Sequence, residues 1–327
     1  MTTQQSIDGL LHAYVLQPDG RGRQISAAEI AGWSAADGVL WLHFDFNHDG
    51  TYAWLSQHSG LSDVAIDVLT VDQTRPRTLS LHNGVLVALR GVNTNPGDDP
   101  EDMVSIRVWV EKDRVISARR RALLAIHDIC HALDEGEGPA SSDGFLADLA
   151  NRLADRIGDF IDDIEDRLLN YEEHVSAEAP ESKRRELSVA RRQIANVRRF
   201  IAPQRDALDR LYRNPGEWFS DTDTQNLREE ADRITRYVED LDLARERAVL
   251  LQEEFLSVIA QQQNSRMYVL SIVAAIFLPL MFVTGLLGMN VGGLPGVNSD
   301  YGFLASVVIM LVCGVAAALI LRWKRWV

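Results

Sequence analysis

The triplet Gly288-Met289-Asn290 directly follows a long uncharged run, and it is the segment best suited to chemistry with cations. The helix is expected to end at this triplet, which lets the Asn290 side chain turn inward. An amide oxygen is a hard, neutral ligand, and it holds the water shell of a divalent ion without binding the ion too tightly. A ring of such amides would select a hydrated ion and still let it pass.

Small, flexible or weakly polar residues recur every three or four positions before the triplet. Counted from Asn264, they are Met267, Ser271, Ala274, Leu278, Met281, Gly285 and Gly288. On a helix this spacing places them on one face, and bulkier residues such as Phe282 lie on the other faces. The pattern has two interpretations: the face lines a pore, or it lets helices pack closely.

A second group with possible metal chemistry is His127 and His131, four residues apart on a predicted helix with Cys130 beside them. Imidazoles at this spacing share a helix face and bind zinc through bonds of about 2.0–2.1 Å. Ordinary polar residues at a helix end give the same pattern. Asp300 is a further candidate ligand, because it is the only acid in the loop after the first uncharged run.

No catalytic constellation is recognisable, and no glycine-rich loop of the P-loop type is present. We therefore expect neither an enzyme nor a permanently bound cofactor. Cys130 and Cys313 are too few for a disulfide framework or a four-thiolate zinc site.

Two charge-free runs, residues 268–287 and 303–321, dominate the C-terminal part. The first would be about 30 Å long as a helix, which matches the hydrocarbon core of a bilayer. Basic residues flank the pair but are absent from the connecting loop, so a transmembrane hairpin with both chain ends in the cytoplasm is predicted. Buried core helices of a soluble protein are the alternative.

The remainder of the chain is strongly acidic. The whole chain carries a net charge of −14, and residues 1–266, with 30 basic and 46 acidic residues, carry −16. This excess argues against a nucleic-acid partner and suits a protein that works among cations. The chain opens without a basic, hydrophobic leader, so we expect residues 1–266 to stay on the side where they are made.

Short apolar runs and turns over the first 135 residues predict a mixed α/β domain. Helical periodicity begins at Asp143. Residues 143–173 are acidic and residues 181–213 are basic, which favours an antiparallel helical hairpin with opposite charges facing. A long helix then runs from about Asp223 into the first span. The predicted division is 1–140 for a cytoplasmic α/β domain, 141–215 for the helical hairpin, 216–267 for a stalk helix, 268–287 for a pore-lining first span, 288–302 for an extracytoplasmic loop, 303–321 for the second span and 322–327 for a basic tail.

The two-span hairpin, the Gly288-Met289-Asn290 triplet and the tail from Arg322 to Trp326 resemble the CorA-type metal ion transporters. The loop Asn290-Val291-Gly292-Gly293-Leu294-Pro295-Gly296 is similar to the zinc transporter branch of that family, ZntB, as are Arg75-Pro76-Arg77 and residues 93–108. The fold class implied is an α+β cytoplasmic domain, a long stalk helix and a two-helix transmembrane hairpin, assembled as a funnel-shaped homopentamer in the bacterial inner membrane.

The resemblance also implies that Asn290 rings the outer mouth of a pore. The pore would be lined by Asn264, Met267, Leu270, Ala274, Leu278 and Met281. It implies zinc movement linked to a proton gradient, yet neither span contains an Asp, Glu, His, Lys or Arg residue that would carry a proton. The hypotheses are a zinc-preferring carrier or channel in contact with lipid, the same architecture for magnesium, cobalt or nickel, and a membrane-anchored metal sensor or scaffold.

Overall fold

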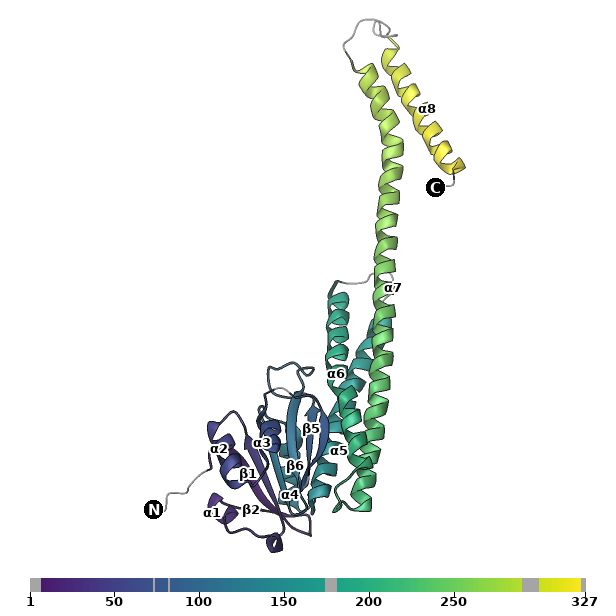
Figure 1. Cartoon of the computed structure of the whole chain (residues 1–327). Coiled ribbons are helices and arrows are strands. Elements are labelled where there is room, and N and C mark those ends of the chain that lie inside the picture. Colours follow the sequence, from purple (N-terminus) through teal and green to yellow (C-terminus); the bar gives the residue numbers. More distant parts are fainter. Residues whose placement is uncertain (1–6, 73, 82, 174–180, 290–299, 325–327) are drawn as a thin grey trace. The chain divides into compact units, whose positions relative to one another are not determined.

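In a computed structural model, the chain is described over residues 7–72, 74–81, 83–173, 181–289 and 300–324. The chain divides into two compact units, one reaching Gln252 and the other beginning at Glu253. Below they are called unit 1 and unit 2. Figure 1 shows the order of the elements along the chain.

Unit 1 begins with strands and short helices. They are β1 (Leu10–Leu16), β2 (Gly22–Gln24), α1 (Ala27–Ile30), η1 (Ala35–Asp37), β3 (Val39–Asp45), α2 (Asp49–His58), α3 (Asp63–Thr70), β4 (Arg77–Leu81), β5 (Gly84–Gly91), β6 (Val104–Val110), β7 (Arg114–Arg119) and α4 (Leu124–Glu135). The long helices are α5 (Ser142–Glu173), α6 (Glu181–Arg213), α7 (Asp221–Leu287) and α8 (Gly302–Trp323).

The strands form one seven-stranded sheet in the order β2-β1-β3-β7-β6-β5-β4. Only β3 and β7 pair in parallel, with Leu42 opposite Ile116, and every other pair is antiparallel. Strands β4 and β5 form one hairpin, and strands β6 and β7 form another. Because their turns are short, both hairpins have local registers that the turn residues help to fix.

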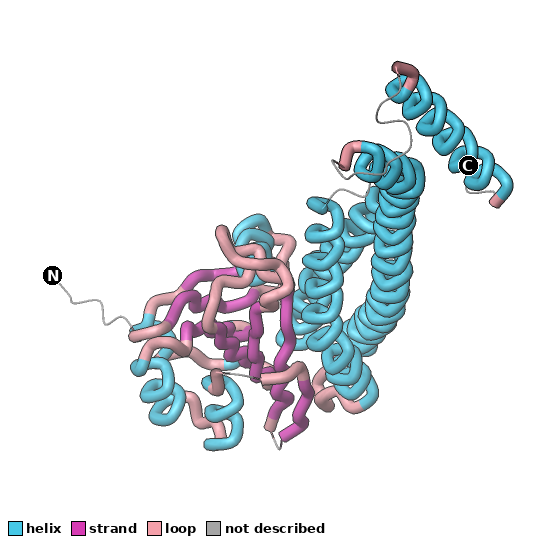
Figure 2. Tube along the Cα trace, turned by 90° about the horizontal axis from the view of Figure 1, so that it is seen from above, coloured by secondary structure: helices cyan, strands magenta, loops and turns pink. Residues whose placement is uncertain are grey.

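Helices lie on both sides of this sheet (Figure 2). On one face, strand residues such as Val15, Leu42 and Phe44 form a core with Leu55 of α2 and Leu69 of α3. On the other face, α4, α5 and α6 cover the strands, and the rings of Trp41 and Phe145 lie 4.8 Å apart. Alternate strand residues supply the two faces, which explains why nearly every side chain of β3 is buried.

The apolar stripes predicted for the long helices are buried in unit 1. Ile157 and Ile164 of α5, Ile194 of α6, and Ile234 and Leu241 of α7 are each 0–1% exposed. Helix α7 begins at a polar cap, because the Ser220 hydroxyl accepts a hydrogen bond from the Asp223 backbone nitrogen at 3.0 Å. The Asp143 carboxylate accepts from the Ser220 nitrogen at 2.8 Å, and this contact ties the start of α7 to the start of α5.

The expected charge pairing between α5 and α6 is wrong. Within the described residues no ion pair joins these two helices. The acids of α5 instead pair with α7, as in Arg233–Asp155 at 2.6 Å and Arg247–Glu172 at 3.3 Å. Helix α6 pairs with α7 too, through Arg198 and Asp242. Helices α5 and α6 still contact each other, as predicted, and Arg167 of α5 donates to the Gln193 side chain of α6 at 3.0 Å. The charge pattern thus predicted this contact but not the ion-pair partners, because α7 offers opposite charges to both helices.

The predicted strands and helices occur in the structure, with shifted ends. The predicted helix that carries His127 and His131 is α4, which begins at Leu124, and α7 continues through Pro279 to Leu287. Strand β2, helix α1 and the 3₁₀ turn η1 were not predicted, because elements of three or four residues show no periodicity. The predicted domain boundaries at residues 140, 215 and 267 stay predictions. The described residues of 1–174 and 180–252 belong to one compact unit.

Candidate functional site

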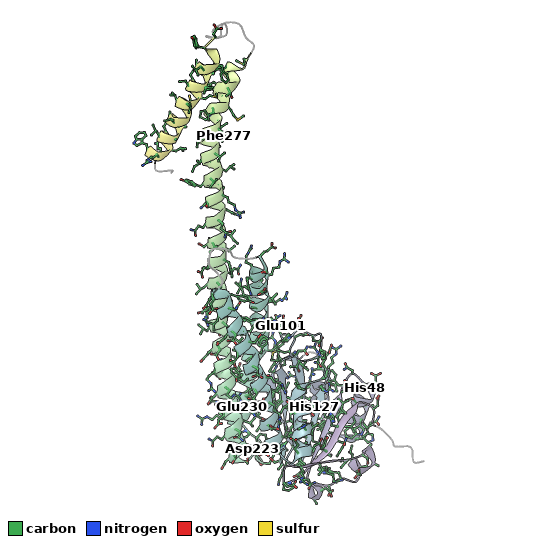
Figure 3. All side chains as sticks on the ribbon, turned by 180° about the vertical axis from the view of Figure 1, so that it is seen from behind. His48, Glu101, His127, Asp223, Glu230 and Phe277 are labelled. Carbon is green, nitrogen blue, oxygen red and sulfur yellow. The ribbon has the colours of Figure 1, made fainter. Side chains whose placement is uncertain are left out.

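The C-terminal half of α7, together with α8, carries the apolar surface of unit 2. Both helices contain windows long and apolar enough to cross a membrane, and 0% and 6% of those windows are buried. Phe277 extends from α7 into the surroundings (Figure 3), with 57% of its surface exposed. An exposed apolar surface of this extent requires a cover of lipid or protein. The predicted spans therefore correspond to helices in the structure.

The candidate pore residues lie on one face of a continuous α-helix. The steps between Met267, Ser271, Ala274, Leu278 and Met281 alternate between four and three residues, which keeps them in one stripe. Met267, Leu278 and Met281 are each 64–66% exposed, while Ala274 is half-buried. Leu270, predicted from resemblance, is exposed next to this stripe, and Asn264 is exposed one turn before it.

Hydroxyl groups in this helix bond to the helix's own backbone. The Ser271 hydroxyl donates to the Met267 carbonyl oxygen at 2.8 Å, and the Thr284 hydroxyl donates to the Met281 carbonyl oxygen at 3.0 Å. Their protons are therefore used within the helix. Each hydroxyl oxygen keeps lone pairs that can accept from water, which suits a surface in contact with a hydrated cation.

The end of α7 is closed by one further backbone bond. The Gly288 nitrogen donates to the Thr284 carbonyl oxygen at 2.9 Å. A Cβ at Gly288 would lie only 3.0 Å from that same oxygen, so glycine fits the tight exit from the helix. Met289 follows and is exposed. Asn290, the predicted selectivity residue, lies outside the described residues, and its role stays a prediction.

Helix α8, which holds the second span, begins at Gly302, shortly after the exposed Asp300, and ends at Trp323. The Lys324 ammonium lies 5.7 Å from the centre of the Trp323 ring. Basic and aromatic side chains next to each other are typical of a membrane interface. Arg325 and Trp326 of the predicted tail lie outside the described residues.

His127 and His131 are both exposed on α4, whereas Cys130 points into the core. Burial raises the pKa of the Cys130 thiol to about 11, so it is not a ready thiolate ligand. His131 pairs with Glu135 at 3.1 Å. Among the described residues, no group of three or more His, Cys, Asp and Glu side chains is arranged to hold a metal ion. Zinc binding by the two histidines stays a prediction.

A buried histidine was missed by the sequence analysis. His43 is fully buried in β3, where its Nδ1 lies 2.7 Å from the Ser117 hydroxyl and its Nε2 accepts from Arg119 at 3.1 Å. Burial, followed by the charges of Arg119 and His12, lowers the pKa of His43 well below its ordinary value. The ring is therefore neutral. Because side chains alternate between the two faces of a strand, the position of His43 in β3 could have predicted its face of the sheet. The sequence could not have predicted its hydrogen-bond partners.

Comparisons with known proteins agree with this arrangement. Residues 36–325 match the family model described as CorA-like Mg²⁺ transporter protein. The chain is 42% identical over 323 residues to the divalent cation transporter CmaX of Pseudomonas aeruginosa, covering 97% of each. It is 33% identical over 313 residues to the zinc transport protein ZntB of Yersinia enterocolitica, covering 96% of this chain and 95% of that one. The structure of full-length CmaX matches with a TM-score of 0.87 and 40% identity over all of both chains.

Proposed function

Because this chain belongs to the CorA family of divalent cation transporters, we propose that it carries hydrated zinc across the bacterial inner membrane through a central pore. The pore is lined by the Met267–Met281 stripe of α7 and formed by five copies of the chain. Both chain ends lie in the cytoplasm, and Asn290 forms a ring at the outer mouth. The family is one of transporters, not an enzyme class.

The observation that carries this proposal is the contrast between the faces of the exposed segment of α7. Bulky apolar residues away from the stripe, such as Val269 and Val273, are 57% and 45% exposed and suit lipid or a neighbouring span. The stripe with Ser271 and Ala274 offers small and weakly polar groups in the same membrane depth. A closed ring of identical helices places one such stripe from each copy around a common axis.

The chemistry of this stripe fits an ion that keeps its water shell. It holds methionine, leucine, alanine and serine side chains and no charged group. A fixed carboxylate would bind a divalent ion directly and slow its release, whereas hydroxyl and amide oxygens contact its water. Any coupled proton must therefore be carried at the ends of the spans, where Asp300 is a candidate.

Zinc is proposed as the preferred ion because the relative from Yersinia enterocolitica is named a zinc transport protein. The relative from Pseudomonas aeruginosa is named only as a divalent cation transporter, and the family model is named for Mg²⁺. A competition assay between zinc and the other divalent ions distinguishes a zinc-preferring pore from a magnesium-preferring one. In proteoliposomes, excess zinc should suppress magnesium, cobalt and nickel flux more strongly than excess magnesium suppresses zinc flux. The reverse order would assign the pore to magnesium.

The role of Asn290 is tested by Asn290→Ala in the full chain reconstituted into liposomes. We expect zinc flux, followed by an enclosed dye, to fall about tenfold or more, because the mouth loses its amide oxygens. Asn298→Ala removes the same side chain from the same loop and should leave flux near the unsubstituted level. Undiminished flux in Asn290→Ala would exclude the selectivity ring. Equal loss in both variants would show that the loop as a whole is required.

A further inference from the structure

An open pocket of about 770 Å³ lies in unit 1 and is rich in arginine. Arg75 precedes β4, Arg90 is on β5, Arg120 and Arg121 directly follow β7, and Arg199 is on α6. The fold thus brings together cations from four separate parts of the sequence. Its volume is in the range of pockets that bind small molecules.

Two aspartates offset only part of this positive charge. Asp72 pairs with Arg120, and Asp102 pairs with Arg121 at 2.7 Å; Asp98, which does not line the pocket, also lies 3.5 Å from Arg121. Five arginines against two aspartates leave a net charge of +3 in the lining. The surrounding residues 1–266 carry −16, so the pocket opposes the charge of its own domain. A local field of this sign attracts anions.

Arg90 is half-buried, and within the described residues its guanidinium forms no ion pair with a carboxylate. It donates to the carbonyl oxygens of Met103 at 2.6 Å and Thr74 at 3.1 Å, and its guanidinium lies 4.0 Å from the centre of the Phe200 ring. Its Nε is buried and has no hydrogen-bond partner among the residues that the structure describes. Burial lowers the pKa of Arg90, the charge of Asp102 opposes part of this shift, and the charges of Arg121 and Arg199 lower the pKa further. A buried cation is costly unless an opposite charge is supplied.

Arg75 and Arg199 have guanidinium groups available for a ligand. Both are exposed, and within the described part of the chain neither has an ion-pair partner. Arg199 lies 5.6 Å from the centre of the Phe200 ring, on which Arg90 also stacks. Planar guanidinium groups bind phosphate oxygens in pairs of parallel hydrogen bonds, a geometry that lysine lacks.

We propose that this pocket, called the arginine pocket, binds the diphosphate or triphosphate group of a soluble small molecule. A terminal phosphate group carries about −1.5 to −2 charges at neutral pH, so two or more phosphates are needed to match +3. The pocket's volume also exceeds what one phosphate fills. This site is separate from the pore, and its test does not depend on ion flux.

Calorimetry on the full chain in detergent, in metal-free buffer, tests the proposal with ADP, ATP and inorganic pyrophosphate. These three should bind about tenfold or more tightly than AMP or inorganic phosphate, because they engage additional arginines. The double substitution Arg75→Ala with Arg199→Ala should weaken ADP and pyrophosphate binding about tenfold or more. Pyrophosphate binding as tight as ADP would show that the phosphates alone are recognised, as proposed.

The matched control is Arg184→Ala with Arg236→Ala, which removes two exposed arginines of α6 and α7 that do not line the pocket. It should leave the affinities unchanged. Asp102→Asn, which removes one negative charge from the lining, should tighten binding and gives a second readout in the opposite direction. Equal affinity for mono- and diphosphates, equal loss in both arginine variants, or no response to Asp102→Asn would each overturn the proposal.

Discussion

His43 makes the stability of unit 1 depend on pH. Its pKa is lowered well below the ordinary value of 6.5 in the folded chain, because the ring is buried beside Arg119 and His12. In the unfolded chain the ring takes up a proton as the pH falls below about 6.5, while the folded chain excludes it. The contribution is therefore fully present above that pH and is lost as the pH falls.

We predict that the free energy of unfolding falls between pH 7.5 and 5.5, with His43 contributing up to about 1.4 kcal/mol per pH unit below 6.5. In His43→Gln this part of the slope should disappear, because an amide can accept from Arg119 without titrating. Urea denaturation followed by tryptophan fluorescence measures the slope. His131→Gln, at an exposed position of α4, is the control and should keep it. An unchanged slope in His43→Gln would contradict the assignment.

At the level of single residues, the spacing of residues along the chain predicted their positions in the structure better than the residue types did. The alternating steps of four and three residues were enough to place Met267, Ser271 and Ala274 on one helix face. The same sequence could not reveal that Cys130 points away from His127, since that depends on which face of α4 meets the sheet. The arginine pocket was missed for a similar reason: its members are far apart in the chain, and only the sheet topology brings them together.

Among the helices, the contact between α5 and α7 depends on Arg233. This side chain donates to Asp155 at 2.6 Å, to Glu230 at 3.0 Å, to Asn151 at 2.9 Å and to Tyr237 at 3.2 Å. Glu230 is 7% exposed, and burial raises its pKa. Arg233 therefore supplies the counter-charge for a carboxylate that is largely removed from water.

We predict that Arg233→Ala destabilises the chain by about 2 kcal/mol, since it leaves Glu230 buried without a partner. Adding Glu230→Gln should recover part of this loss by removing the unpaired charge. Arg236→Ala, three residues along α7 at an exposed position, should change stability by less than about 0.5 kcal/mol. Urea denaturation compares the variants. A loss no greater than that of Arg236→Ala would show that the cluster adds little.

Long elements were predictable because their periodicity extends over many turns, as in α5, α6 and α7. The contact between α5 and α6 was predictable, but the ion-pair partners of these helices were not, because α7 offers opposite charges to both. Strand β2 and helix α1 were not predicted from the sequence for another reason. They are three and four residues long, and they exist because the sheet and the Ser26–Glu29 capping box hold them.

For the whole molecule, the division at Gln252 leads to a prediction about truncation. A chain ending at Gln252 retains the sheet and its covering helices but none of the exposed apolar surface of unit 2. We expect it to stay in solution without detergent and to keep its secondary structure, measured by circular dichroism and light scattering. Precipitation of this fragment under conditions that keep the full chain dissolved in detergent would place the boundary elsewhere.

The proposed ring of five copies predicts the mass of the assembled protein. The full chain in detergent should have a protein mass five times 36.6 kDa, measured by light scattering with correction for bound detergent. A protein mass of 36.6 kDa that still supports zinc flux would contradict a pore shared between copies. Together with the flux of Asn290→Ala, this measurement separates failure of the assembly from failure of the selectivity ring.

The two outermost strands of the sheet restrict how copies can associate. Strand β2 is three residues long and β4 is five, and each carries an exposed arginine, Arg23 and Arg77. Short edge strands with charged side chains discourage a strand of another molecule from adding to the sheet. Contacts between copies are therefore expected away from these two sheet edges. The fold is therefore protected against strand-mediated aggregation even where many copies crowd together in a membrane.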